Sequence, residues 1–182
     1  YPKMKAMLAQ SRVKTLIIGN MPEVLPFPKS LLFPLFKRAD IASVPNDKDH
    51  VAFAQLINND GAWTPADVDP EKDIAVLQYT GGTTGVSKGA MLTHANLYAN
   101  TIQGKEWFEG MVDGEETMMG VLPFFHVFAM TVVMNLSIAA AAKIIMHPRF
   151  ELEPVLKDLH KKRPTLFPGV PTMYTAINNY PQ

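Results

Sequence analysis

The residues with the clearest chemical potential lie in one short segment, Thr80 to Gly89, which reads TGGTTGVSKG. Glycines let the backbone adopt positive φ angles, so that successive N–H groups can converge on one anion. Threonine hydroxyls add hydrogen-bond donors, and Lys88 adds a mobile positive charge. This combination favours binding of a polyphosphate. The candidate ligand-binding residues are Thr80, Gly81, Gly82, Thr83, Thr84, Gly85, Lys88 and Gly89.

This segment differs from the two standard nucleotide-binding loops. Ser87 precedes Lys88 where a P-loop has glycine, and Gly89 replaces the serine or threonine that would ligate Mg²⁺. The spacing does not match the GxGxxG fingerprint either. The alternative interpretation is a glycine-rich hairpin with Lys88 as a solvated charge. The residue types alone favour phosphate binding over that alternative.

Regular elements are expected around the segment. Ile74–Gln78 and Ala90–Leu92 are typical of strands, and Thr93 is a good N-cap for a helix over His94–Glu106. Strands that alternate with helices predict an α/β fold, with a mostly parallel sheet and flanking helices. The loop after a strand then lies at the carboxyl edge of the sheet, where ligands bind. The other expected elements are strands at Lys14–Gly19, Thr117–Leu122, Ala142–Met146 and Thr165–Phe167, and helices from about Val127, over Glu151–Lys162 and over Pro171–Asn179.

The N-terminal part of the chain is less regular. Met21–Arg38 contains four prolines, and we expect no regular element there. Its second half, SLLFPLFKR, is expected to be a loop pinned on the core, with contact to a membrane surface as the alternative. Asp47–Leu56 is a candidate short helix.

The composition limits the classes of function. The chain has 182 residues, of which 47% are hydrophobic and 19% charged. This length and composition fit one folded domain or a piece of a larger one. A net charge of zero argues against a nucleic-acid partner. The absence of cysteine excludes disulfides and thiolate metal sites and fits a cytoplasmic protein. Phe124–Ala142 lacks charged side chains, but His126, Asn135 and Ser137 within it favour a buried helix over a membrane span.

Three segments resemble motifs of the adenylate-forming enzymes, a family of acyl-CoA synthetases, luciferases and adenylation domains of peptide synthetases. The first is YTGGTTGVSKGAMLTHANL, the second is VLPFFHVFA at Val121–Ala129, and the third is FPGVPTMY at Phe167–Tyr174. The form YTGGTTG…KGAMLTH is most similar to bacterial long-chain fatty-acid–CoA ligases. The resemblance extends over nearly the whole chain.

The resemblance implies that ATP, Mg²⁺ and coenzyme A convert a fatty acid to an acyl-adenylate and then to a thioester. The loop from Thr80 to Gly89 would hold the β- and γ-phosphates, with Lys88 as a phosphate ligand. His126 would lie beside the substrate carboxylate and gate between the two half-reactions. The other residues implied for the acyl pocket are Phe125, Gly169, Val170 and Thr172.

Several motifs of the family are not found: the glutamate that holds Mg²⁺, the aspartate that binds the ribose, and the lysine of a small C-terminal domain. We therefore expect an internal fragment of the large N-terminal domain, without a metal ligand of its own and inactive alone. Residues 1–72 are expected to form a partial subdomain with proline-rich and polar loops, and residues 73–182 an α/β subdomain that binds nucleotide and acyl group. We also expect self-association through exposed apolar surface and a cytoplasmic location, with peripheral contact at the inner face of the membrane as a further hypothesis.

Other functions remain open on the sequence. The chain fits a second kind of adenylate-forming enzyme, one that acts on aromatic or amino acids. It also fits a non-catalytic nucleotide-binding or membrane-associated module, or an inert scaffold whose glycine-rich loop binds nothing. Replacing Lys88 by alanine in the complete protein separates the inert scaffold from the rest.

Overall fold

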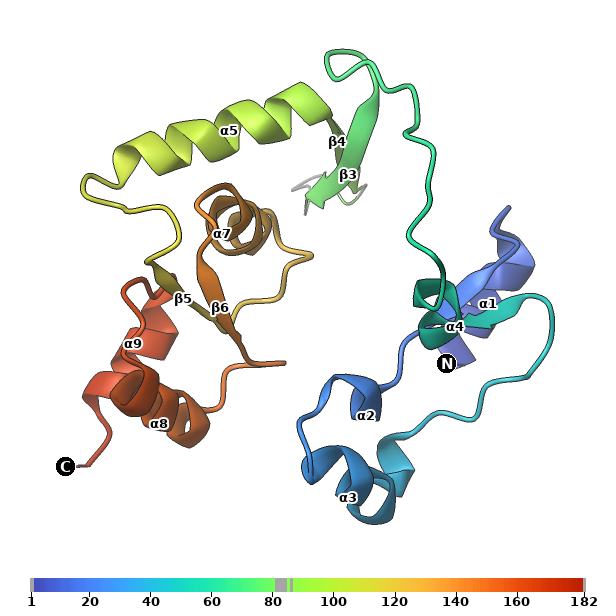
Figure 1. Cartoon of the computed structure of the whole chain (residues 1–182), viewed down its shortest axis with the longest axis horizontal. Coiled ribbons are helices and arrows are strands. Elements are labelled where there is room, and N and C mark those ends of the chain that lie inside the picture. The colour runs from blue at the N-terminus through green and yellow to red at the C-terminus, as the bar shows by residue number, and fades with distance from the viewer. Residues whose placement is uncertain (1, 81–84, 86, 182) are drawn as a thin grey trace. The chain divides into compact units, whose positions relative to one another are not determined.

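The computed structural model describes residues 2–80, 85 and 87–181. The chain divides into two compact units, Tyr1–Ala66 and Asp67–Gln182. In Figure 1 the first unit runs from blue to teal and the second from green to red. The motifs singled out in the sequence all belong to the second unit.

The first unit is built on a short parallel pair of strands. These strands pair from Leu16↔His50 to Ile18↔Ala52. Its elements are α1 (Pro2–Gln10), β1 (Leu16–Ile18), α2 (Met21–Val24), α3 (Lys29–Phe36), a 3-10 turn η1 (Arg38–Asp40), β2 (His50–Ala52) and α4 (Phe53–Ile57).

Three expectations for this unit are wrong. Met21–Arg38 contains α2 and α3 rather than irregular chain. Pro22 lies in the first turn of α2, where its missing N–H costs nothing, whereas Pro34 lies inside α3. The apolar stretch is not pinned on a core either, since α3 has no buried residue in the described structure. The predicted helix over Asp47–Leu56 is replaced by β2 followed by the short α4.

The second unit contains most of the expected elements. The N-cap predicted at Thr93 is present, and it forms a capping box with Asn96: the Asn96 amide donates to Thr93 Oγ1 at 3.2 Å, and the Thr93 amide donates to Asn96 Oδ1 at 3.1 Å. The elements are β3 (Ile74–Thr80), β4 (Lys88–Thr93), α5 (His94–Trp107), β5 (Thr117–Gly120), α6 (Val127–Ala129), the π-helix η2 (Met130–Asn135), α7 (Leu136–Ala139), β6 (Lys143–Met146), α8 (Leu152–Lys162) and α9 (Pro171–Asn178).

The core of this unit has three layers around the parallel pair β5–β6. Side chains alternate between the two faces of a strand. Met118 therefore packs against Val133 and Leu136 of the apolar helix, and Met119 packs against Val155 of α8. Figure 1 shows α7 on one side of β5 and β6, with α8 and α9 on the other. The expected α/β architecture with parallel strands and flanking helices is confirmed.

The expected strand at Thr165–Phe167 is reduced to one isolated parallel bridge between Met118 and Leu166. Backbone amides still tie this stretch to β5, since Met119 N–H donates to the Leu166 carbonyl at 2.8 Å. The apolar segment after Phe124 forms α6, η2 and α7 without interruption, and Val133 and Leu136 are fully buried in it. Among residues 2–80, 85 and 87–181, no helix has both the length and the apolar character that crossing a bilayer requires.

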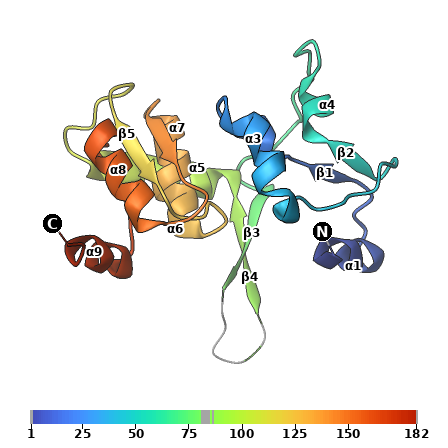
Figure 2. The same ribbon diagram turned by 90° about the horizontal axis from the view of Figure 1, so that it is seen from below.

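The glycine-rich loop connects two antiparallel strands. β3 and β4 pair antiparallel and form a two-stranded sheet of their own, visible along its length in Figure 2. The inference that this loop lies at the carboxyl edge of a parallel sheet is therefore wrong. The alternative expectation of a glycine-rich hairpin is correct for the two strands. This geometry does not decide whether the loop binds a ligand.

Candidate functional site

The β3–β4 hairpin positions the base of the glycine- and threonine-rich loop. Thr80 faces Lys88 at the last described pair of the ladder, and Tyr79 faces Gly89 one pair earlier. Gly85 has a φ of +82°, a conformation that glycine adopts without strain. The predicted ligand residues Gly81, Gly82, Thr83 and Thr84 lie outside the described residues, so their role stays a prediction.

Gly89 has a packing role that the sequence did not indicate. A Cβ atom at this position would lie 3.3 Å from Cζ of the Tyr79 ring. The ring therefore packs against the position of a side chain at Gly89, and a Cβ atom there would require the ring to shift by a few tenths of an ångström. Close approach of a cross-strand aromatic ring explains this glycine without a ligand, whereas the positive φ of Gly85 fits a turn.

A cavity of about 560 Å³ adjoins the end of β3. Its volume lies within the range of small-molecule sites, about 300–1,000 Å³. Most of the lining is apolar, and His126 contributes an ionisable imidazole. The lining residues are Gln78, Tyr79, Leu122, His126, Val127, Phe128, Ala129 and Val170. The cavity thus joins the strand before the loop, the second motif and the third motif.

His126 reaches the cavity because it is the N-cap residue of α6. Its backbone is extended, with φ −83° and ψ 132°, and its carbonyl accepts the first helical hydrogen bond from Met130 N–H at 2.9 Å. The imidazole makes no capping hydrogen bond to the helix. The side chain is exposed, and its ring centroid lies 4.5 Å from that of Phe125. It is therefore available to a ligand in the cavity.

Of the other predicted pocket residues, one lines the cavity and the rest do not. Val170 lines the cavity as the N-cap residue of α9. Phe125 does not line it; 74% of the side chain is exposed, and the ring lies against His126. Thr172 is exposed on α9 and is also outside the lining.

Gly169 precedes the cavity residue Val170 and lies against the ring of Tyr174. A Cβ atom there would lie 3.0 Å from Cζ of Tyr174. The Tyr174 hydroxyl donates to the Phe167 carbonyl at 2.8 Å, and the two rings pack edge to face with centroids 5.7 Å apart. Tyr174 thus packs over the turn that leads to Val170, and a Cβ atom at Gly169 would require its ring to shift by a few tenths of an ångström.

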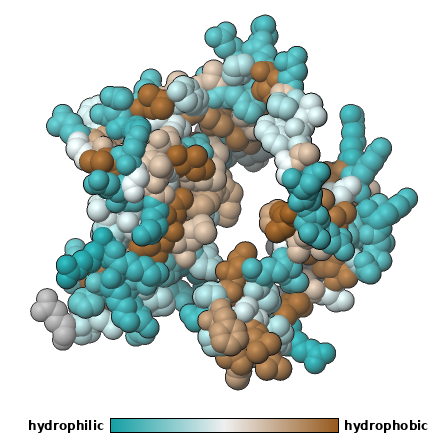
Figure 3. Space-filling model, in the orientation of Figure 1, coloured by the Kyte–Doolittle hydropathy of each residue, from teal (hydrophilic) through white to brown (hydrophobic). Residues whose placement is uncertain are grey.

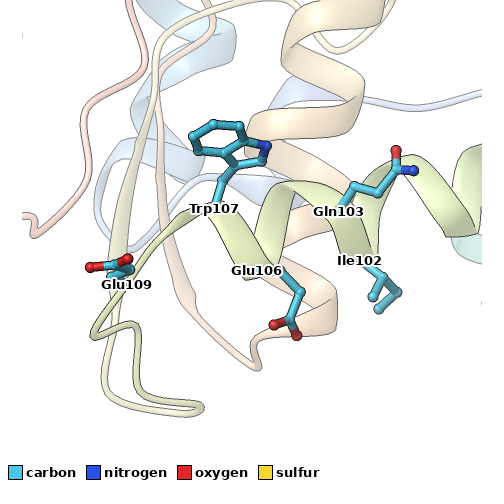
Figure 4. Close-up of a pocket in the computed structure, with 5 residues that line it drawn as sticks. All are labelled: Ile102, Gln103, Glu106, Trp107 and Glu109. Carbon is cyan, nitrogen blue, oxygen red and sulfur yellow. The ribbon is translucent and has the colours of Figure 1, made fainter.

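A second hollow, of about 370 Å³, lies at the C-terminal end of α5 and contains no motif residue. Figure 4 shows its lining: Trp107 and Gln103 project from one side of the helix, while Ile102 and Glu106 project from the other. Because these side chains diverge, they offer no converging set of polar groups. The cavity beside His126 is therefore the candidate site.

Glu116 and Asp158 are two of the carboxylates outside the cavity whose pKa is lowered. The Thr165 hydroxyl and then the Val112 amide donate hydrogen bonds to Glu116, and they hold the pKa of this carboxyl below its ordinary value. For Asp158, burial raises the pKa, but the ammonium of Lys162 and the imidazole of His147, at 2.9 and 3.0 Å, lower it overall. Both carboxylates tie secondary-structure elements together.

The sequence did not indicate several walls of the cavity. Gln78, Tyr79 and Leu122 line it, yet none was a candidate residue. Tyr79 is part of the first motif, and its position directly before the loop could have identified it as a cavity residue. In the part of the chain that the structure describes, no three His, Cys, Asp or Glu side chains are placed to hold a metal ion.

The fold and the site agree with the comparisons to known proteins. The family model described as AMP-binding enzyme matches residues 2–182. The chain belongs to this family, and the predicted resemblance is confirmed.

Proteins similar to this chain include long-chain-fatty-acid–CoA ligases and a 4-coumarate–CoA ligase. The chain is 42% identical over 188 residues to a long-chain-fatty-acid–CoA ligase of Bacillus subtilis, covering all of this chain and 33% of that protein. It is 34% identical over 116 residues to a probable 4-coumarate–CoA ligase of Dictyostelium discoideum, covering 63% of this chain and 21% of that protein. The crystal structure of a long-chain-fatty-acid-CoA ligase from Archaeoglobus fulgidus superposes with a TM-score of 0.65 at 25% identity, covering 97% of this chain and 34% of that one. The chain thus spans between about a fifth and a third of the length of these ligases.

Proposed function

We propose that this chain is part of an ATP-dependent long-chain fatty acid–CoA ligase. The observation that supports this most is the cavity in which His126 and Val170 meet the end of β3, directly before the glycine- and threonine-rich loop. The similarity to the Bacillus subtilis ligase over the whole chain supports the choice of substrate.

The proposed reaction has two steps. The fatty acid carboxylate attacks the α-phosphorus of ATP, which gives an acyl-adenylate and pyrophosphate. The thiol of coenzyme A then attacks the acyl carbon, and AMP leaves. In the first step two anions must approach in line, so their repulsion and the charge on the leaving pyrophosphate have to be offset.

The residues of this chain serve that first step. Backbone amides of the loop and the ammonium of Lys88 would hold the β- and γ-phosphates, since N–H dipoles and a positive charge stabilise an anion. His126 would bind and orient the carboxylate at the mouth of the apolar cavity. The described residues do not fit a Mg²⁺ site, because they offer no cluster of ligands, so no step is assigned to a metal held here.

The substrate class is testable in the longer protein that contains this chain. Exchange of labelled pyrophosphate into ATP is measured with fatty acids of increasing chain length, 4-coumarate and amino acids. Exchange with long-chain fatty acids supports the proposal, and exchange with 4-coumarate or an amino acid alone identifies another acid-activating enzyme. ATP binding without exchange for any acid identifies a non-catalytic module. The 182-residue chain alone is expected to give no exchange.

We also propose a cytoplasmic protein that contacts the inner face of the membrane through α3. Leu31, Leu35 and Phe36 are exposed on this helix, and Lys37 and Arg38 follow it. The brown surface at the bottom of Figure 3 lies over α3, as comparison with Figure 1 shows. Apolar side chains beside basic ones favour an interface with anionic lipid. Self-association through exposed apolar side chains is the competing proposal.

A further inference from the structure

One aromatic side chain contacts both the base of the loop and the cavity. The ring of Tyr79 lies over Gly89, with Cζ, Cε1 and Cε2 at 3.3, 3.4 and 3.6 Å from the position of a Cβ atom there. The same residue lines the cavity that contains His126. Yet 64% of Tyr79 is exposed, so its position does not follow from burial in a core.

The hairpin needs such a contact at this position. In the described structure, β3 and β4 pair only with each other, and a two-stranded sheet is marginally stable in water. A slip of one residue would turn every side chain to the opposite face. A ring that covers the bare backbone of an opposing glycine contributes a cross-strand contact that holds this register. Because Tyr79↔Gly89 lies next to Thr80↔Lys88, it fixes the register at the entrance of the loop.

We propose that Tyr79 is a positioning residue for Lys88: its ring packs on Gly89 and thereby sets where Lys88, the next residue of the ladder, lies relative to the cavity. This inference rests on the proposed function. In this proposal Gly89 provides the surface on which the Tyr79 ring packs, and it does not need to contact phosphate itself.

The proposal is tested with four variants of the longer protein: Tyr79→Ala, Tyr79→Phe, Gly89→Ala and the double variant Tyr79→Ala/Gly89→Ala. Gly104→Ala is the matched control, because Gly104 lies within α5 and a Cβ atom there would meet nothing within 4 Å. The readouts are KM for ATP and kcat in pyrophosphate exchange, the dissociation constant for ATP by calorimetry, and the melting temperature.

Loss of the cross-strand contact in Tyr79→Ala is expected to raise KM for ATP about fivefold. The added methyl group in Gly89→Ala displaces the ring and is expected to raise it about tenfold. Tyr79→Phe keeps the ring and is expected to restore the low KM that Tyr79→Ala loses, and Gly104→Ala is expected to match the wild type.

The double variant is decisive, because residues that act through one contact are not additive. We expect its KM to be no higher than that of Gly89→Ala. A KM near the product of the two single effects, or a Tyr79→Ala protein that binds ATP as the wild type does, would overturn the inference while leaving the ligase proposal intact. A wild-type protein that binds no ATP would overturn both.

Discussion

Replacing His126 by alanine should separate activity from stability. The imidazole is exposed, caps no backbone group of α6 and contacts the Phe125 ring at a centroid distance of 4.5 Å. Loss of an exposed aromatic contact costs about 0.5 kcal/mol, the lower end for such pairs. We therefore expect the free energy of unfolding to change by no more than this amount.

The expected effect on activity is larger. If His126 donates a hydrogen bond to the substrate carboxylate in the cavity, the lost interaction is worth about 1.5–3 kcal/mol, because the acceptor is charged. This corresponds to a decrease of about 10- to 100-fold in kcat/KM for the fatty acid. KM for ATP should change much less, since the phosphate loop is on a separate hairpin.

The assay measures the two half-reactions separately in the longer protein. Pyrophosphate exchange reports adenylation, and thioester formation from preformed acyl-adenylate reports the second step. His94→Ala is the matched control, because His94 is an exposed histidine at the first position of α5 and does not line the cavity. Equal activities of the two variants, or a loss of activity explained by a lower melting temperature, would refute the assigned role of His126.

Two further predictions concern stability and location. The pKa of Glu116 is lowered from its ordinary value of 4.5, so its contribution to stability is present above that pH and is lost as the pH falls through the folded-state pKa. Glu116→Gln should therefore lower the melting temperature at neutral pH and reduce its further fall on acidification, and an unchanged acid limb would contradict this. For α3, the double variant Leu35→Ser/Phe36→Ser should reduce sedimentation of the longer protein with anionic vesicles. Equal sedimentation, with a smaller particle in light scattering, would instead assign these side chains to self-association.

The sequence predicted best those elements whose signals are local. Thr93 is an example, because an N-cap hydroxyl and Asn96 three residues later need only each other to form a capping box. The strand expected at Thr117–Leu122 is likewise present as β5, and its pleat places Met118 and Met119 in two different helical layers. The family assignment came from the first motif, since its spacing of glycine, threonine and lysine is specific.

The failures involve tertiary contacts. The sequence does not say whether two neighbouring strands pair with each other or with distant ones, so the antiparallel β3–β4 pair was placed in a parallel sheet. The prolines of Met21–Arg38 suggested irregular chain, although proline is tolerated in the first turn of a helix. Leu122 was missed for the same reason, because it becomes a neighbour of Tyr79 only in the folded chain.

The central claim is that the segment from Thr80 to Lys88 holds the phosphates of ATP beside the His126 cavity. The most direct test is a crystal structure of the longer protein with ATP bound. We expect phosphate oxygens within hydrogen-bond distance of the loop amides and of the Lys88 ammonium, with the α-phosphate facing the cavity. Phosphates bound elsewhere, with the loop amides turned away from them, would contradict the account.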